Sequence, residues 1–277
     1  LPAPGGQSID SQRTYRLVET GQHSQPVPVD LVPALADDGT AAKSWRLAAN
    51  VPPNMGAGAT RRFQLESIKA QSLAAFRFAD VSDKSLGLWE GRRPVLVYNH
   101  GILSKDGVPT NFNRSTYVHP LYGLDGEVLT DDFPKDHYHH RGLCWAWPHV
   151  TIGGKETDLW ACRGIYQRFE RWLFKEAGAA SATLGIENGW YVEDKKVVQE
   201  RVWLRVHQAT RDEWTMDVEL TWIPLGQPLT LMGAPGKSYG GLTLRYAPRT
   251  NTVITTTLGN DNKDLAITHL PWGDLSA

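Results

Sequence analysis

Hydrophobic and polar residues alternate along several stretches of the chain. The most regular stretch runs from Trp214 to Trp222, where a hydrophobic residue occupies every second position. A period of two is that of a β-strand with one buried side and one solvent-facing side. Val202–Val206 repeats the pattern, and helical periodicity is scarce. We expect further strands at Val27–Leu31, Arg62–Ile68, Val95–Tyr98, Leu242–Tyr246 and Thr252–Thr257.

Glycine-containing pairs mark turns between the expected strands. Asp125-Gly126, Gly153-Gly154 and Asn188-Gly189 each lie between two segments of strand character, which predicts three hairpins. The segment Cys162–Lys175 suits a helix and a strand equally well. Many short strands separated by turns are typical of a sandwich or barrel.

We therefore expect an all-β fold with few helices, built as a sandwich or a barrel. All-β sandwiches of this length often form one domain, so residues 1–277 are expected to be a single domain. Residues 1–12 are expected to be a loose arm.

Composition narrows the classes of function. The 29 Lys and Arg balance 30 Asp and Glu without a long basic run, so a nucleic-acid partner is not indicated. No window approaches the roughly 18 apolar residues of a membrane span. The 11 tryptophans are numerous. Aromatic rings fill β-protein cores, but exposed ones also stack on sugars, which favours a carbohydrate ligand.

The chain carries little information on its compartment. Two cysteines, Cys144 and Cys162, suit one disulfide or two buried thiols. The start Leu1-Pro2-Ala3-Pro4 is what removal of a signal peptide leaves, and equally what any trimming leaves. On this basis we expect export to the periplasm or the exterior.

The densest chemical signal is a histidine-rich stretch centred on Asp136–Arg141. Four of the nine histidines fall within 22 positions. Histidine titrates near neutrality, binds metals and transfers protons, so such crowding is a candidate site. The alternative is that these histidines only satisfy backbone groups in loops. The candidate residues are His119, Tyr122, Asp132, Asp136, His137, His139, His140, Arg141 and Trp145.

Geometry suggests two kinds of site. If residues 136–141 are extended, His137 and His139 project to one face, and Asp136 and His140 to the other. His137 and His139 can then share a divalent metal with a third ligand. His119 is the first candidate for that ligand, followed by Asp132, His100 and His269. Without a metal the same groups act as general acid, base and charge stabiliser.

The run Asp136-His137-Tyr138-His139-His140-Arg141-Gly142 resembles a motif of the family named methane oxygenase PmoA-like. The resemblance includes His119 to Gly123 and Trp272 to Ser276, and covers about residues 90–277. It implies a bacterial protein of sugar catabolism whose fold is a large antiparallel β-sandwich similar to the galactose-mutarotase type. Relatives continue beyond the Trp272–Ser276 segment, which implies that C-terminal strands are absent here or lie on a second chain or subunit.

These observations together predict an enzyme that acts on a sugar or glycoside by proton transfer, as a lyase, epimerase or hydrolase. His137 and His140 would share the acid and base roles, and His139 and His119 would position substrate or hold a metal. Arg141 would bind the carboxylate of a uronate. The remaining candidates would bind substrate, with Tyr122 and Trp145 stacked on the sugar; they include His100, His269, Asp132 and Asp136.

Two alternatives stay open. In a carbohydrate-binding protein without activity, the histidines would be hydrogen-bonding partners of a sugar held on aromatic rings. In a metal-dependent oxygenase, a redox metal would be needed, and no complete facial triad is identifiable in the sequence.

Overall fold

The structure, a computed structural model, describes residues 10, 13–21, 25–52, 56, 58–68, 74–237, 239–263 and 265–276. These residues form an all-β fold in which every strand pairing is antiparallel. One short 3-10 helix, η2 (Thr110–Phe112), interrupts the described strands. No helix of the described residues has the length and apolar character needed to cross a membrane. The predicted fold class is confirmed.

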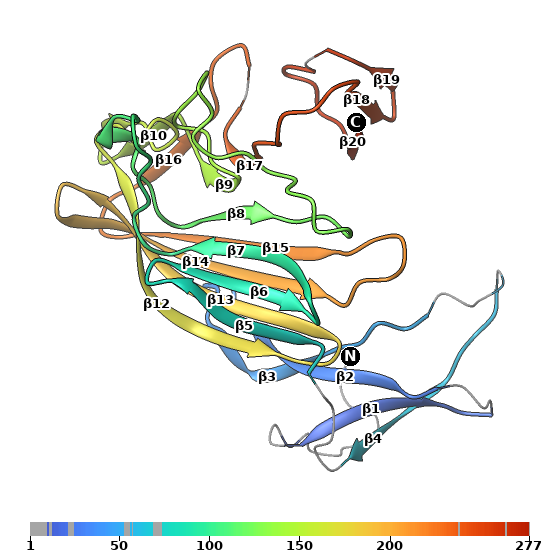
Figure 1. The fold of residues 1–277 in the computed structure, drawn as a ribbon. Coiled ribbons are helices and arrows are strands. Elements are labelled where there is room, and N and C mark those ends of the chain that lie inside the picture. The colour runs from blue at the N-terminus through green and yellow to red at the C-terminus, as the bar shows by residue number, and fades with distance from the viewer. Residues whose placement is uncertain are drawn as a thin grey trace.

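Two sheets form the sandwich (Figure 1). The six-stranded sheet has the order β17-β9-β8-β7-β6-β5 and the four-stranded sheet the order β12-β13-β14-β15. The strands of the first are β5 (Phe76–Ser82), β6 (Ser85–Glu90), β7 (Arg93–Asn99), β8 (Tyr117–Leu121), β9 (Leu143–Ala146) and β17 (Gly241–Leu244). Those of the second are β12 (Tyr166–Ala177), β13 (Ser181–Val192), β14 (Lys195–His207) and β15 (Met216–Pro224).

Three smaller sheets surround the sandwich. The N-terminal sheet contains β1 (Thr14–Glu19), β2 (Val27–Leu35), β3 (Ala41–Ala48) and β4 (Phe63–Ile68). A second contains β10 (His149–Ile152), β11 (Lys155–Thr157) and β16 (Leu229–Met232). The third, nearest the C-terminus, contains β18 (Val253–Thr256), β19 (Gly259–Asp261) and β20 (Gly273–Ser276).

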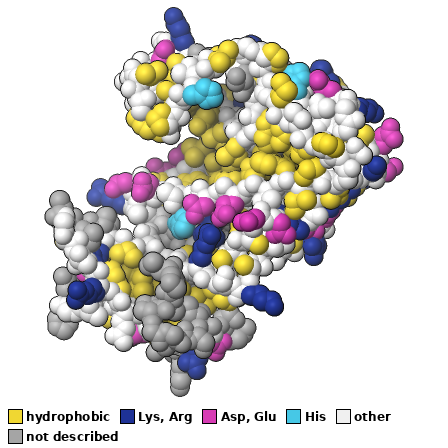
Figure 2. Space-filling model, turned by 180° about the vertical axis from the view of Figure 1, so that it is seen from behind, with side chains coloured by type: hydrophobic (Ala, Val, Ile, Leu, Met, Phe, Trp, Pro, Cys, Tyr) yellow, Lys and Arg dark blue, Asp and Glu magenta, His cyan; other side chains and the backbone are white. Residues whose placement is uncertain are grey.

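The main core lies between the two large sheets. Residues of β6, β7 and β8 meet residues of β13 and β14 there, with Val95, Val118 and Ile186 fully buried. Hydrophobic side chains that leave water on both inner faces supply the favourable free energy of the sandwich. A second core under β10 and β16 includes Trp190 and Leu159. Figure 2 shows further hydrophobic side chains in a hollow across the middle of one face.

The period-two patterns mark strands correctly. The two best, at 214–222 and 202–206, lie in β15 and β14, and the other five expected strands overlap β2, β4, β7, β17 and β18. The ambiguous segment Cys162–Lys175 is mainly strand β12, because its aromatic residues pack against the core. Gly153-Gly154 is the hairpin turn between β10 and β11. Asp125-Gly126 also turns, and a bridge between Tyr122 and Val128 closes it.

The predicted hairpin at Asn188-Gly189 is wrong. Both residues lie inside β13, where Asn188 is fully buried. Its amide donates to Glu200 on β14 at 2.8 Å, so a polar side chain is satisfied within the sheet. Gly189 serves close packing, because a Cβ there would lie 2.6 Å from Glu170 Oε1. A glycine inside a strand often marks a site of close approach.

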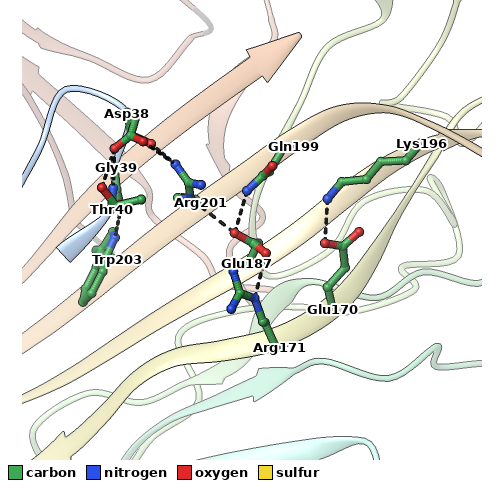
Figure 3. A network of polar contacts seen from close by, with 10 residues as sticks. All are labelled: Asp38, Gly39, Thr40, Glu170, Arg171, Glu187, Lys196, Gln199, Arg201 and Trp203. Carbon is green, nitrogen blue, oxygen red and sulfur yellow. Dashed lines mark hydrogen bonds and ion pairs between the residues drawn. The ribbon is translucent and has the colours of Figure 1, made fainter. Parts of the chain in front are cut away.

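The N-terminal sheet is tied to the four-stranded sheet by polar contacts. The β2–β3 turn lies against β14, where Arg201 pairs with Asp38 at 3.2 Å and the Trp203 indole donates to the Gly39 carbonyl (Figure 3). At the other end of β2, the Asp30 carboxylate accepts the backbone N–H groups of residues 179–181. Of the expected N-terminal arm, residues 1–9, 11 and 12 lie outside the described residues.

Candidate functional site

The histidine-rich segment is a pair of tight turns between β8 and β9, not an extended strand. His137 N–H donates to the Pro134 carbonyl at 3.0 Å, and His140 N–H donates to the His137 carbonyl at 2.9 Å. The extended geometry expected for residues 136–141 is therefore wrong, and so is its division of the side chains between two faces. A turn brings residues three apart together, and His137 stacks on His140 with ring centroids 4.7 Å apart and 7° between the planes.

The third imidazole joins the same cluster. The His139 ring meets His140 edge to face at 4.6 Å and lies 5.6 Å from His137. We call His137, His139 and His140 the histidine cluster. The sequence predicted that these three residues belong to one site, and the structure brings them together.

Asp136 orients the first of these histidines. Its carboxylate contacts His137 Nδ1 at 2.9 Å and accepts two hydrogen bonds from Arg245 Nη2, each 3.0 Å. The hydrogen bond with His137, and then the contacts with Arg245, lower the Asp136 pKa to about 2. Asp136 is thus ionised at neutral pH and favours the His137 tautomer whose Nδ1 carries the proton.

Arg245 is a site residue that sequence reasoning missed. It follows β17 and is held beside the cluster by backbone hydrogen bonds with Gly142 (2.7 Å) and Asp131 (2.9 Å). Its second terminal nitrogen lies 3.4 Å from His140 Nδ1. More than a hundred positions separate Arg245 from Asp136, and no local pattern marks it.

The other two imidazoles are held neutral. Burial, followed by the proximity of His139 and His137, lowers the pKa of His140 to about 4. Burial and then His137 also lower the pKa of His139. Because a neutral imidazole has both a donor and an acceptor nitrogen, each can hydrogen-bond a hydroxyl group at neutral pH.

Aromatic rings border the histidine cluster. Trp160 meets His140 at 5.6 Å, edge to face, and Tyr239 packs on Trp160 at 4.9 Å. On the other side Phe112 lies 6.3 Å from His139. Tyr239 is 43% exposed and Trp160 is partly exposed. The high tryptophan content indicated such rings but not their positions, and the predicted stacking residues were different ones.

Arg141 is not placed to bind a substrate carboxylate, which corrects its predicted role. Its side chain is 0% exposed, pairs with Asp132 at 3.2 Å and donates to the Phe112 carbonyl. Its guanidinium also lies over the Phe133 ring, 3.1 Å from the centroid. The Asp132 carboxylate further accepts the Tyr117 hydroxyl at 2.9 Å, and burial raises the Asp132 pKa. Both residues hold the two ends of the segment 132–141 together.

The predicted stacking residues lie elsewhere. Trp145 is fully buried in the main core, so its stacking on a substrate is wrong. Tyr122 lies at the end of β8, where its backbone pairs with Val128 and Val95. None of the contacts found for either residue among the described residues reaches the histidine cluster.

The three other histidines predicted for the site make no ring contact with the cluster among the described residues. His119 contacts Thr130 Oγ1 through Nδ1 at 2.9 Å, and burial lowers its pKa. His100 packs on Phe169 and Trp172, with centroids 5.2 and 5.3 Å away. His269 is exposed between β19 and β20. The ring contacts of the described residues join none of these three to the cluster.

The predicted metal set is not assembled. In the part of the chain that the structure describes, no three or more His, Cys, Asp or Glu side chains are arranged to hold one metal ion. Among the described residues, ring contacts join His137 and His139 to each other but not to His119.

Comparisons with known proteins identify a family but no activity. No curated protein and no solved structure matches the chain. The model of a family of unknown function, DUF6807, matches residues 88–277, more than half of the chain, and the protein therefore belongs to this family.

Proposed function

We propose that this protein is an enzyme that transfers a proton on a carbohydrate, with His137 as the acid–base group. The observation that carries the proposal is the Asp136–His137 pair at 2.9 Å, stacked on a neutral His140 beside exposed aromatic rings. The resemblance of the histidine-rich stretch to proteins of sugar catabolism supports the same substrate class.

The pair has the chemistry of a general base. Asp136 accepts the Nδ1 proton of His137, which leaves Nε2 with a lone pair to receive a proton from substrate. The carboxylate then stabilises the imidazolium that forms. The His137 side chain is 51% exposed, so a bound sugar can reach it.

The surroundings suit a sugar. The Trp160 and Tyr239 rings offer faces on which the C–H bonds of a sugar ring stack. His139 and His140, held neutral, offer donors and acceptors to hydroxyl groups.

Arg245 takes the role that Arg141 cannot perform. It is a cation in contact with the cluster, and its side chain is 31% exposed. A guanidinium there neutralises a substrate carboxylate and stabilises the enediolate formed when the adjacent carbon loses its proton. β-Elimination or epimerisation of a uronate residue is therefore the reaction class that the arrangement supports best, ahead of hydrolysis.

The test is turnover of uronate-containing oligosaccharides, followed by NMR and by the absorbance of unsaturated products. His137→Ala should reduce turnover by about 10²- to 10⁴-fold, the usual contribution of acid–base catalysis. His149→Ala is the matched control, because His149 Nδ1 contacts Glu156 at 2.8 Å in a similar pair on β10. It should keep full activity.

Two results would contradict the proposal. Equal turnover by His137→Ala and the wild type would remove His137 from the chemistry. Saturable sugar binding without product, across uronates and neutral glycosides, would make the protein a carbohydrate-binding protein instead of an enzyme.

A further inference from the structure

A pocket lies at the end of the four-stranded sheet, where β14 turns into β15. Its volume is about 370 Å³, within the roughly 300–1,000 Å³ typical of small-ligand sites. Its walls include Asn50, His207, Gln208, Glu213, Trp214 and Asp217. None of the residues that line it belongs to the histidine cluster.

Hydrogen bonds of the backbone hold the residues that line the pocket in place. Beyond β14 the chain turns tightly, with Thr210 N–H donating to the Glu213 carbonyl at 2.9 Å and His207 N–H to the Thr215 carbonyl at 3.0 Å. The Asn50 amide donates to the Gln208 carbonyl at 3.0 Å, which ties the segment after β3 to this turn. The pocket is therefore formed before any ligand arrives.

The polar wall presents mainly acceptors. His207 Nε2 contacts the Asp217 carboxylate at 2.9 Å, and Asp217 also lies 3.7 Å from Arg205. Glu213 adds a second carboxylate, and its backbone closes the turn. Two carboxylates repel an anionic ligand, whereas hydroxyl groups donate well to them.

Trp214 also lines the pocket, and it packs partly on the main core. An indole fixed by the core offers a rigid face at small cost in conformational entropy. A lining that includes an indole, two carboxylates and an amide suits a hydroxyl-rich ring without negative charge.

The pocket is remote from the histidine cluster. Met216, at the start of β15, pairs with Val206, and Trp222 near its other end packs on Trp147 at 4.9 Å. At about 3.3 Å per residue, the strand places these two ends roughly 20 Å apart. The backbone carbonyl of Trp147 accepts the N–H of Trp160, so the Trp222 end of β15 is the end nearer the cluster.

We propose that this pocket binds a neutral sugar residue, so that the protein holds carbohydrate at two separate places. This inference rests on the proposed function only for the class of ligand. A polysaccharide that contains both uronate and neutral residues would then bind at the pocket through a neutral residue and react at the histidine cluster through a uronate residue.

The test is titration of ¹⁵N-labelled protein with methyl glucosides and methyl galactosides, with glucuronate and tetramethylammonium as comparison ligands. The indole N–H signal of Trp214, assigned from its loss in Trp214→Phe, should shift with the neutral glycosides only. Trp214→Leu should weaken their binding by about tenfold or more. Asp217→Ala, a change at an exposed position, should also weaken it and serves if Trp214→Leu does not fold.

His137→Ala should leave this binding unchanged, which separates the two proposals. Binding at Trp214 without any turnover would contradict the proposed function and support the pocket. The pocket proposal is wrong if no neutral glycoside shifts the Trp214 signal, or if Asp217→Ala binds as the wild type does. It is also wrong if tetramethylammonium or glucuronate binds there more tightly than the neutral glycosides.

Discussion

Among single residues, Asp136 connects the two parts of the chain that form the histidine cluster. Its carboxylate contacts both His137, its neighbour in the sequence, and Arg245, which follows β17 at the edge of the six-stranded sheet. Charge-assisted hydrogen bonds of this kind are stronger than neutral ones, and they favour the ionised acid. The state of Asp136 therefore reports directly on the integrity of the site.

The first prediction concerns the Asp136 pKa. Both His137→Ala and Arg245→Met should raise it from about 2 towards the ordinary value of 3.8. The increase should be larger for His137→Ala, because the hydrogen bond with His137 is the main cause of the lowering. An NMR pH titration of the side-chain carboxyl carbon measures both. An unchanged Asp136 pKa in the two variants would mean that these contacts are absent in solution.

The second prediction concerns stability against pH. An unfolded histidine binds a proton below about pH 6.5, but folded His140 does so only near pH 4. The unfolded chain binds more protons between these values, so the free energy of unfolding should fall as pH decreases from 6.5 to 4. His140→Gln should reduce that fall, leaving the part due to His100, His119 and His139, whose pKa values are also lowered.

Urea unfolding at pH 7, 5.5 and 4 measures this dependence for the wild type and His140→Gln. Parallel curves for the two proteins would show that His140 protonates at its ordinary pKa in the folded state.

Among the elements, the four-stranded sheet is joined by one buried carboxylate. Glu200 on β14 is 0% exposed and accepts hydrogen bonds from each of the other three strands of that sheet. The donors are Gln167 on β12 at 3.1 Å, Asn188 and Trp190 on β13 at 2.8 and 2.7 Å, and Trp222 on β15 at 3.1 Å. A buried acceptor with this many donors makes the register of the four strands specific.

The third prediction is that Glu200→Ala destabilises the protein by about 3–5 kcal/mol. Several buried donors lose their acceptor at once, and each such loss costs roughly 1–3 kcal/mol with partial relaxation. Urea unfolding measures the change. Glu219→Ala on the neighbouring strand removes an exposed carboxylate 4.0 Å from Arg46 and should stay within about 0.5 kcal/mol. A similar small effect for Glu200→Ala would mean that water replaces the carboxylate.

At the scale of the whole molecule, the chain has a sandwich and an N-terminal sheet that packs on it. The family match begins at residue 88, inside β6, and so omits the whole N-terminal sheet. The Asp30 carboxylate accepts N–H groups from Ala179, Ala180 and Ser181 at 2.6–3.0 Å, which anchors β2 at the β12–β13 turn. Among the described residues, no side chain of β1–β4 belongs to either hydrophobic core, so the sheet should open before the sandwich does.

The fourth prediction is that Asp30→Ala increases hydrogen exchange in β1–β4 while β12–β15 keep their protection. Three N–H groups lose their acceptor, and the loss acts where the two parts meet. Asp37→Ala, at an exposed position of the β2–β3 turn, is the control and should not change exchange. A uniform loss of protection over both sheets would show instead that the two unfold as one cooperative unit.

Much of the fold could be predicted because the period-two pattern of a strand depends only on residues a few positions apart in the sequence. The alternation at 214–222 and 202–206 identifies β15 and β14, and Gly153-Gly154 identifies a hairpin. The hairpin predicted at Asn188-Gly189 was wrong because the same dipeptide suits both a turn and a tightly packed strand. Only Glu200 and Glu170, from other parts of the chain, decide between the two.

The candidate site was predicted in part for the same reason. His137, His139 and His140 are close in sequence, so their proximity in space follows almost from connectivity. Arg141 and Trp145 are neighbours of these histidines in the sequence, but their side chains are buried. The site is completed by residues more distant in the sequence, namely Arg245, Trp160 and Tyr239. Which side of a turn or strand faces solvent depends on what packs against it.

The sequence by itself determined the all-β class, most strands and the crowding of the three histidines, because each depends on residues a few positions apart. The tertiary structure alone decided that the segment 134–140 turns, that Arg141 is buried against Asp132, and that Arg245 holds Asp136. The physical reason is that burial and ion pairing arise between segments distant along the chain, whose approach is set by the packing of whole sheets.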